Sequence, residues 1–73
     1  MVDLKYDIIE EIVVLSESAK GWTKELNLIS WNGRDAKYDI RDWSSDKEKM
    51  GKGVTLTKEE LLCLRDALNK VKL

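Results

Sequence analysis

The sequence predicts an α+β domain in which a four-stranded antiparallel sheet precedes one C-terminal helix. Three observations predict this fold. Runs rich in Ile, Val, Trp and Tyr recur between residues 6 and 43, as is typical of strands. The pair Asn32–Gly33 is a strong hairpin signal, because both residues tolerate a positive φ. A stretch with helical periodicity comes last, and strands followed by a helix are typical of this class.

The strands are predicted in chain order. The first covers residues 6–18, is rich in Ile and Val and contains neither Gly nor Pro. A Lys-Gly turn leads to the second strand at 22–31, in which both alternating faces mix apolar and polar residues, a pattern that a β-bulge would explain. The third strand covers 37–43, a polar loop covers 44–53, and a short fourth strand covers 54–56.

The helix begins after Thr57, because Thr57 and Glu60 form a capping-box pair. Its apolar residues recur at intervals of three and four and give one stripe. We expect this stripe to cover one sheet face and to leave the other open, with surplus apolar residues meeting a second chain. The stripe and its flanking residues are Leu61, Leu62, Leu64, Ala67, Leu68, Val71 and Leu73.

The chain of 73 residues predicts a single domain, 1–73. A domain this small is marginal alone, and no disulfide or metal site is evident, so we expect a homodimer. There is one cysteine, no histidine, no apolar run long enough for a membrane span and no signal-peptide pattern. These features favour a cytoplasmic protein.

Charge is unevenly distributed along the chain. The net charge of −1 argues against a nucleic-acid binder. However, residues 1–19 hold one Lys and five acids, whereas residues 20–53 hold eight Lys or Arg and six acids. The basic excess therefore lies in the middle of the chain, which is a mild hint of an anionic partner.

Alternation in the strand 37–43 separates two faces. Tyr38 and Ile40 make the natural core face, so Trp43 is expected to point outward beside Lys37 and Arg41. Exposed aromatic rings among cations are what single-stranded nucleic acid requires, since rings stack on bases and cations follow the phosphates.

Two structural explanations compete with this one. Trp43 would be core if it folded over the sheet edge onto the helix, and Asp39 would neutralise the two cations as a plain ion pair. For the other tryptophans a core position is as probable as an exposed one, whereas Asn27 is expected to lie outward or to cap a bulge. The further candidates, in the second strand, the hairpin and the loop, are Trp22, Lys24, Asn27, Trp31, Arg34, Lys49 and Lys52.

Catalytic motifs are not found. Without histidine the usual general base and zinc ligand are missing. Cys63 is expected to be a buried structural residue, and the Gly51–Gly53 segment lacks the spacing of a phosphate-binding loop. We therefore predict no enzyme activity, no metal, no cofactor and no small-molecule substrate.

Three segments, "KGWTKELNLISWN", "KYDIRDW" and "KMGKGVTLTKEEL", resemble in this order the bacterial YdbC family, relatives of the eukaryotic transcriptional coactivator positive cofactor four. The resemblance spans residues 5–71. It implies a β-β-β-β-α fold, a homodimer, strongly curved sheets and binding of single-stranded DNA with little sequence preference. It also implies that Arg41 is the backbone-binding arginine of the "DIR" motif and that Trp43 lies near the stacking aromatic residue.

The eukaryotic relatives carry a regulatory Ser- and Lys-rich N-terminal extension, whereas this chain begins almost at its first strand. The resemblance therefore implies the DNA-binding core rather than the promoter-coactivator role. The predicted partner is single-stranded DNA, with RNA as a related ligand, in transcription, replication or repair. The alternative is a protein–protein interaction module that uses the same aromatic and cationic sheet face.

Overall fold

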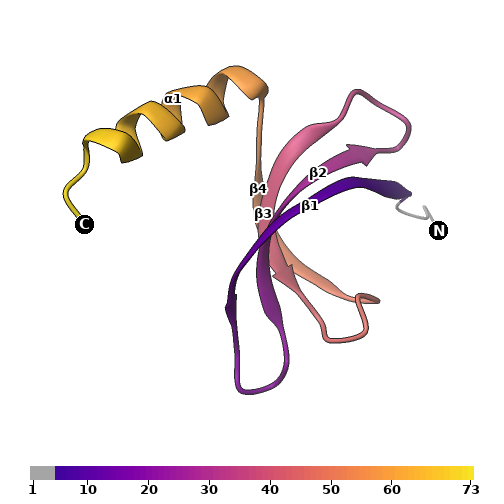
Figure 1. Ribbon diagram of the computed structural model, residues 1–73. Coiled ribbons are helices and arrows are strands. Elements are labelled where there is room, and N and C mark those ends of the chain that lie inside the picture. Colours follow the sequence, from indigo (N-terminus) through magenta and orange to yellow (C-terminus); the bar gives the residue numbers. More distant parts are fainter. Residues whose placement is uncertain (1–4) are drawn as a thin grey trace.

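A computed structural model describes residues 5–73 and contains four strands followed by one helix (Figure 1). The strands form one antiparallel sheet in the order β1-β2-β3-β4, so the predicted fold class is confirmed. No helix among these residues is long and apolar enough to cross a bilayer. The elements are β1 (Tyr6–Glu17), β2 (Thr23–Trp31), β3 (Lys37–Trp43), β4 (Met50–Leu56) and α1 (Lys58–Lys70).

The predicted Asn-Gly turn joins β2 to β3. Asn32 and Gly33 have φ angles of 53° and 74°, the left-handed conformation that these two residue types tolerate best. The N–H of Arg34 donates to the carbonyl of Trp31 at 3.0 Å and closes the turn. The local signal in the sequence therefore corresponds directly to the local structure.

The bulges lie in β1 and not in β2, where the sequence analysis expected one. Pairing between β2 and β3 is continuous, whereas the register between β1 and β2 shifts three times. Each shift leaves one apolar residue of β1 without a partner, namely Ile9, Ile12 and Leu15. Bulges bend and twist the strand that carries them, so this series gives β1 its strong curvature.

β4 is longer than predicted, because it begins at Met50 and not at Val54. The sequence analysis assigned its glycines to a loop. Gly53 instead pairs with Arg41 in the sheet, and a Cβ at position 53 would overlap the Arg41 side chain and the carbonyl oxygen of Ile40. The glycine is required by this close approach between strands.

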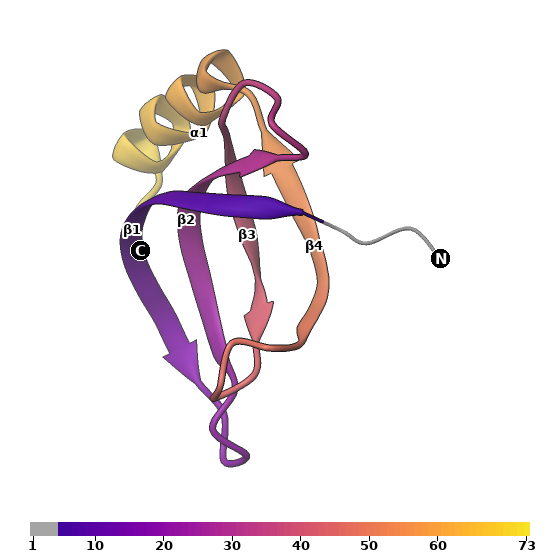
Figure 2. The same cartoon turned by 90° about the vertical axis from the view of Figure 1, so that its right-hand side faces the viewer.

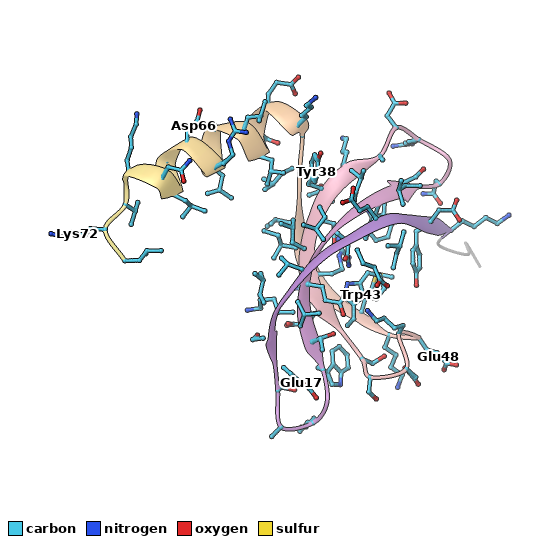
Figure 3. The ribbon with its side chains drawn as sticks, in the orientation of Figure 1. Glu17, Tyr38, Trp43, Glu48, Asp66 and Lys72 are labelled. Carbon is cyan, nitrogen blue, oxygen red and sulfur yellow. The ribbon has the colours of Figure 1, made fainter. Side chains whose placement is uncertain are left out.

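The curved sheet has two distinct faces. The first half of β1 crosses over the sheet (Figure 2), which brings Tyr6 within 5.5 Å of Trp43 although β1 and β3 are not neighbours. We call this side, turned away from α1, the concave face, and the opposite side the helix-side face. Figure 3 shows Trp43 on the concave face and Tyr38 on the helix-side face.

Helix α1 begins with the predicted capping box. Thr57 Oγ1 accepts from the N–H of Glu60 at 3.1 Å, and the Glu60 carboxylate accepts from the N–H of Thr57 at 2.8 Å. The helix then runs away from the sheet (Figure 1). Leu61 is half-buried, but no helical residue is fully buried. The expectation that the helix covers one sheet face is therefore wrong for all but its first turn.

An open apolar groove of about 640 Å³ separates α1 from the helix-side face. Its walls include Leu26, Tyr38 and Ile40 of the sheet and Leu64 and Leu68 of the helix. Cys63 is exposed, which contradicts its expected burial, because the helix runs away from the sheet.

Candidate nucleic-acid interface

Three aromatic rings meet on the concave face. The ring centroid of Tyr6 lies 5.5 Å from both that of Trp31 and that of Trp43, with tilted planes. Tilted pairs at this separation are favourable beyond the area that they bury. Trp43 is completely buried, whereas Trp31 and Tyr6 are only half-buried. The cluster therefore has a closed floor at Trp43 and an accessible rim at Trp31 and Tyr6.

Arg41 is fixed beside this cluster by a buried ion pair. Its Nε and Nη2 each donate to one carboxylate oxygen of Asp39 at 2.7 Å, and its guanidinium carbon lies 4.7 Å from the Trp31 ring centroid. Asp39 is fully buried and the Arg41 side chain is 15% exposed. A guanidinium has five N–H donors, so Arg41 keeps N–H groups beyond those that bind Asp39.

A second cluster of polar side chains surrounds Glu25 on the same face. Its carboxylate accepts hydrogen bonds from Thr23 at 2.5 Å, from Asn27 at 3.1 Å and from the Lys47 ammonium at 2.5 Å. Burial alone would raise the pKa of Glu25. The hydrogen bonds, with that from Lys47 the strongest, outweigh this effect and lower the pKa below its usual value.

The β3–β4 loop carries Lys47 to Glu25. Ser44 donates to the carboxylate of Asp46 at 2.6 Å, and the same carboxylate accepts from the N–H of Glu48 at 3.0 Å, which lowers the pKa of Asp46. Lys47 itself has a φ of 65°, unusual for a residue with a side chain. The loop places its ammonium 6.0 Å from the centroid of Trp43, so Lys47 helps to cover that ring.

Two predicted exposures are wrong. Trp43 lies on the face that alternation predicted, but it is 0% exposed, because the curvature of β1 places Tyr6 over it. Asn27 was expected outward or at a bulge. It is 1% exposed and donates to Glu25, which satisfies its amide inside the fold. Neither side chain offers a free surface in this conformation.

The predicted site residues divide between the two faces. Those of β2 and β3 at alternating positions lie on the concave face, where Lys37 is exposed at the end nearest Trp31, and Arg34 is exposed in the adjoining hairpin. Trp22 and Lys24 lie toward the opposite, helix-side face. Lys49 in the loop and Lys52 in β4 are exposed. The structure therefore unites Asn27, Trp31, Lys37, Arg41 and Trp43 on one face but not the other five.

Tyr6, Glu25, Asp39 and Lys47 belong to this region although the sequence analysis did not select them as site residues. Asp39 appeared there only as a neutralising acid. Tyr6 carried no signal, because its contact with Trp43 depends on the curvature of β1. Asp39 shares the strand face of Arg41 and Trp43, which alternation predicted to be exposed, so its burial in a polar network was not predicted.

A small curved sheet that presents accessible aromatic rings beside arginine and lysine is the arrangement found in modules that bind an extended anionic chain. The comparison with known families agrees with this class. Residues 18–67 match the family described as Transcriptional Coactivator p15 (PC4), and this chain belongs to that family. It is also 56% identical over 71 residues to an uncharacterized protein of Treponema pallidum (strain Nichols), a match that covers 97% of this chain and 84% of that protein.

Proposed function

We propose that this chain is a homodimeric single-stranded-DNA-binding protein of the bacterial YdbC type, a binding module and not an enzyme. It acts in the cytoplasm, in transcription or in DNA replication and repair. The observation that carries the proposal is the concave face, where the half-buried Trp31 ring lies 4.7 Å from the Arg41 guanidinium. The PC4 family, which is known for single-stranded DNA binding and coactivation, supports it.

The rim of the concave face would bind the strand. Bases stack on Trp31 and Tyr6, and stacking contributes roughly 1–3 kcal/mol per base. Arg34 and Lys37 are exposed at the same end and neutralise phosphates, while Arg41 holds Trp31 in place and offers its remaining donors. In place of the stacking role first expected for Trp43, this buried ring forms the floor against which Tyr6 and Trp31 pack.

The second chain of the dimer would fill the groove between α1 and the sheet. Leu15, Leu64 and Leu68 are 53%, 39% and 50% exposed in the single chain. A groove of about 640 Å³ with such walls is unfavourable in water. A second copy provides an identical helix with a matching apolar stripe, so one symmetric contact would bury both grooves.

The experiment that tests binding is a fluorescence-anisotropy titration of a labelled oligo-dT of about 20 nucleotides, long enough to cover such a face. It is performed at two salt concentrations, beside the matching duplex and an oligo-U strand. We expect tight binding of the single strand, weaker binding of the duplex, and a slope in log salt of about −0.7 per neutralised phosphate.

The competing function is docking of a partner protein, which the exposed apolar residues of the groove favour. It predicts no oligonucleotide binding at low salt, and that result would overturn the DNA-binding proposal. A duplex bound as tightly as the single strand would overturn its stacking mechanism, because paired bases leave no free ring face for Trp31.

A further inference from the structure

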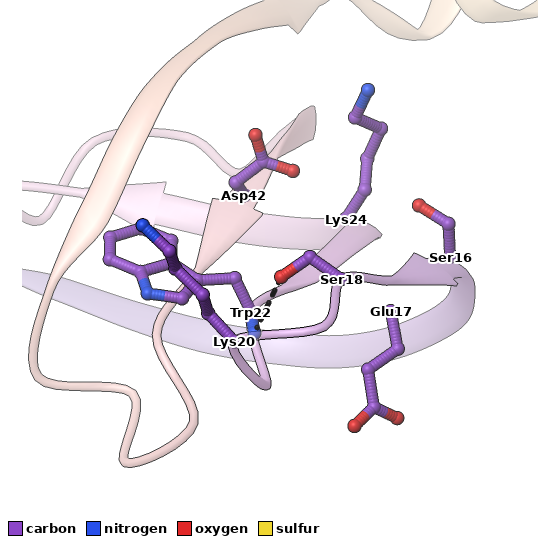
Figure 4. A pocket seen from close by; sticks show the side chains of 7 residues that line it. All are labelled: Ser16, Glu17, Ser18, Lys20, Trp22, Lys24 and Asp42. Carbon is purple, nitrogen blue, oxygen red and sulfur yellow. Dashed lines mark hydrogen bonds between the residues drawn. The ribbon is translucent and has the colours of Figure 1, made fainter.

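A second group of aromatic and charged side chains lies outside the concave face, where β1 turns into β2 (Figure 4). It lines a cleft of about 480 Å³, within the range of sites that accept small ligands. The cleft is more polar than the groove beside α1, and nothing in the mechanism proposed above uses it. Its lining residues are Ser16, Glu17, Ser18, Lys20, Trp22, Lys24 and Asp42.

The turn holds Trp22 in a defined position. Ser18 donates its N–H to the carbonyl of Trp22 at 2.7 Å, and its hydroxyl accepts from the N–H of Trp22 at 3.2 Å. Gly21, with a φ of 84°, donates to the carbonyl of Ser18 at 3.0 Å. Two of these hydrogen bonds fix the backbone of Trp22 and the third closes the turn before it. The half-buried Trp22 ring lines the cleft and offers it a flat aromatic surface.

Asp42 supplies an unused acceptor to the same cleft. It is paired with Lys24 in the β2–β3 register, yet its carboxylate forms no ion pair or hydrogen bond with any side chain among residues 5–73. Asp39, three positions earlier on the other face, has both oxygens occupied by Arg41. Figure 4 shows the Asp42 carboxylate at the Trp22 side of the cleft and the Glu17 carboxylate pointing the opposite way.

We propose that this cleft binds one guanine base of a bound single strand, an inference that rests on the proposed DNA-binding function. The Watson–Crick edge of guanine carries two adjacent donors, N1–H and N2–H, which match the two acceptor oxygens of a carboxylate. On adenine, cytosine and thymine, a donor on that edge stands beside an acceptor, which would face the carboxylate charge. Trp22 stacks on the base, and Lys20 and Lys24 lie close enough to neutralise its phosphate.

The inference adds one selective position to a binding path that otherwise tolerates any base. Its test compares labelled strands of about 20 nucleotides built from repeats of TTG, TTA, TTC or TTT, in a lithium buffer that disfavours guanine quadruplexes. The repeats place the third base in every register, so the position of the cleft along the strand need not be known. We expect the TTG strand to bind roughly tenfold more tightly than the TTT strand, the size of effect for one bidentate base contact.

Two variants assign the preference to its residue. Asp42→Asn keeps the shape but presents one donor and one acceptor, so the TTG advantage should disappear while affinity for TTT changes less than twofold. Asp66→Asn makes the same charge change on the exposed face of α1 and should retain the advantage. Equal affinity of the wild-type protein for all four repeats overturns the guanine site, and so does a preference that survives Asp42→Asn. Failure to bind any strand would instead overturn the proposed function itself.

Discussion

Residues 5–73 contain two arginine–aspartate pairs that differ in burial, and this difference predicts unequal effects of removing the arginine. In the Arg41–Asp39 pair the side chains are 15% and 0% exposed, and in the Arg65–Asp66 pair they are 65% and 63% exposed. Arg41→Leu leaves the buried carboxylate without its two hydrogen bonds, a change that typically costs about 3–5 kcal/mol. Arg65→Leu removes an exposed pair worth about 0–1 kcal/mol.

The assay is urea unfolding followed by tryptophan fluorescence, because Trp43 is buried in the folded protein. All variants are compared at one protein concentration, since the proposed dimerisation would make the apparent stability depend on concentration. In a domain of this size, 3 kcal/mol corresponds to a fall in Tm of roughly 12 °C or more, so Arg41→Leu should be mostly unfolded in mild urea while Arg65→Leu matches the wild type.

A double variant shows whether the loss of stability in Arg41→Leu comes from the unpaired Asp39 charge or from lost packing. If the uncompensated Asp39 charge causes the loss, Asp39→Asn combined with Arg41→Leu should recover a substantial part of the stability. Equal, small losses in Arg41→Leu and Arg65→Leu would refute the reasoning, because the burial of Asp39 would then carry no electrostatic penalty.

Three further predictions concern pH, backbone approach and assembly. The pKa of Glu25 is lower in the folded protein than its value of about 4.5 in the unfolded chain. The stability that Glu25 contributes is therefore fully present above pH 4.5 and is lost as the pH falls through the pKa of the folded state. Lys47→Met should flatten this part of a pH series of urea midpoints, and an unchanged acid limb would contradict the role of the ion pair. Gly53→Ala should destabilise the fold by about 1–3 kcal/mol in thermal unfolding, because the added Cβ would push Arg41 away from Trp31. In the control Gly51→Ala the added Cβ meets only ordinary contacts, so this variant should unfold like the wild type. If the groove beside α1 is the dimer contact, Leu64→Glu should give a monomeric mass in light scattering. The control Lys58→Glu, at the exposed start of the helix, should remain dimeric. A dimeric Leu64→Glu protein would exclude this groove as the dimer contact.

Local signals in the sequence were sufficient for the local structure. The capping box of α1 and the turn at Asn32–Gly33 depend only on residues within one turn of each other, and both formed as predicted. The secondary structure of the glycines before Val54 was ambiguous, because it depends on a residue that is distant in the sequence. Glycine is typical of a loop, but in β4 a glycine is needed at position 53 because the strand passes very close to Arg41 of β3. Residue propensities do not describe such a contact between two strands.

The site was predicted less completely than the fold, and Trp43 shows why. Alternation along β3 placed its side chain on the correct face. Exposure, however, depends on how far the sheet bends, and the bend comes from the bulges at Ile9, Ile12 and Leu15 in another strand. Ile8, Val13 and Val14 of the same strand are apolar as well, so its sequence contains no spacing that marks these three positions as bulges.

The two faces of the sheet explain why such a small domain would need a partner. Among residues 5–73 the fully buried apolar side chains are Ile29 and Trp43, while Glu25, Asn27 and Asp39 occupy other buried positions. Buried polar networks give a defined geometry but little net stability. The concave face therefore holds Trp31 and Arg41 rigidly in place without supplying an adequate hydrophobic core. The apolar surface that would supply one lies on the opposite, helix-side face and is open in a single chain. Burial of that surface by a second copy would stabilise the fold away from the concave face, and would leave the concave face of each chain free for a strand.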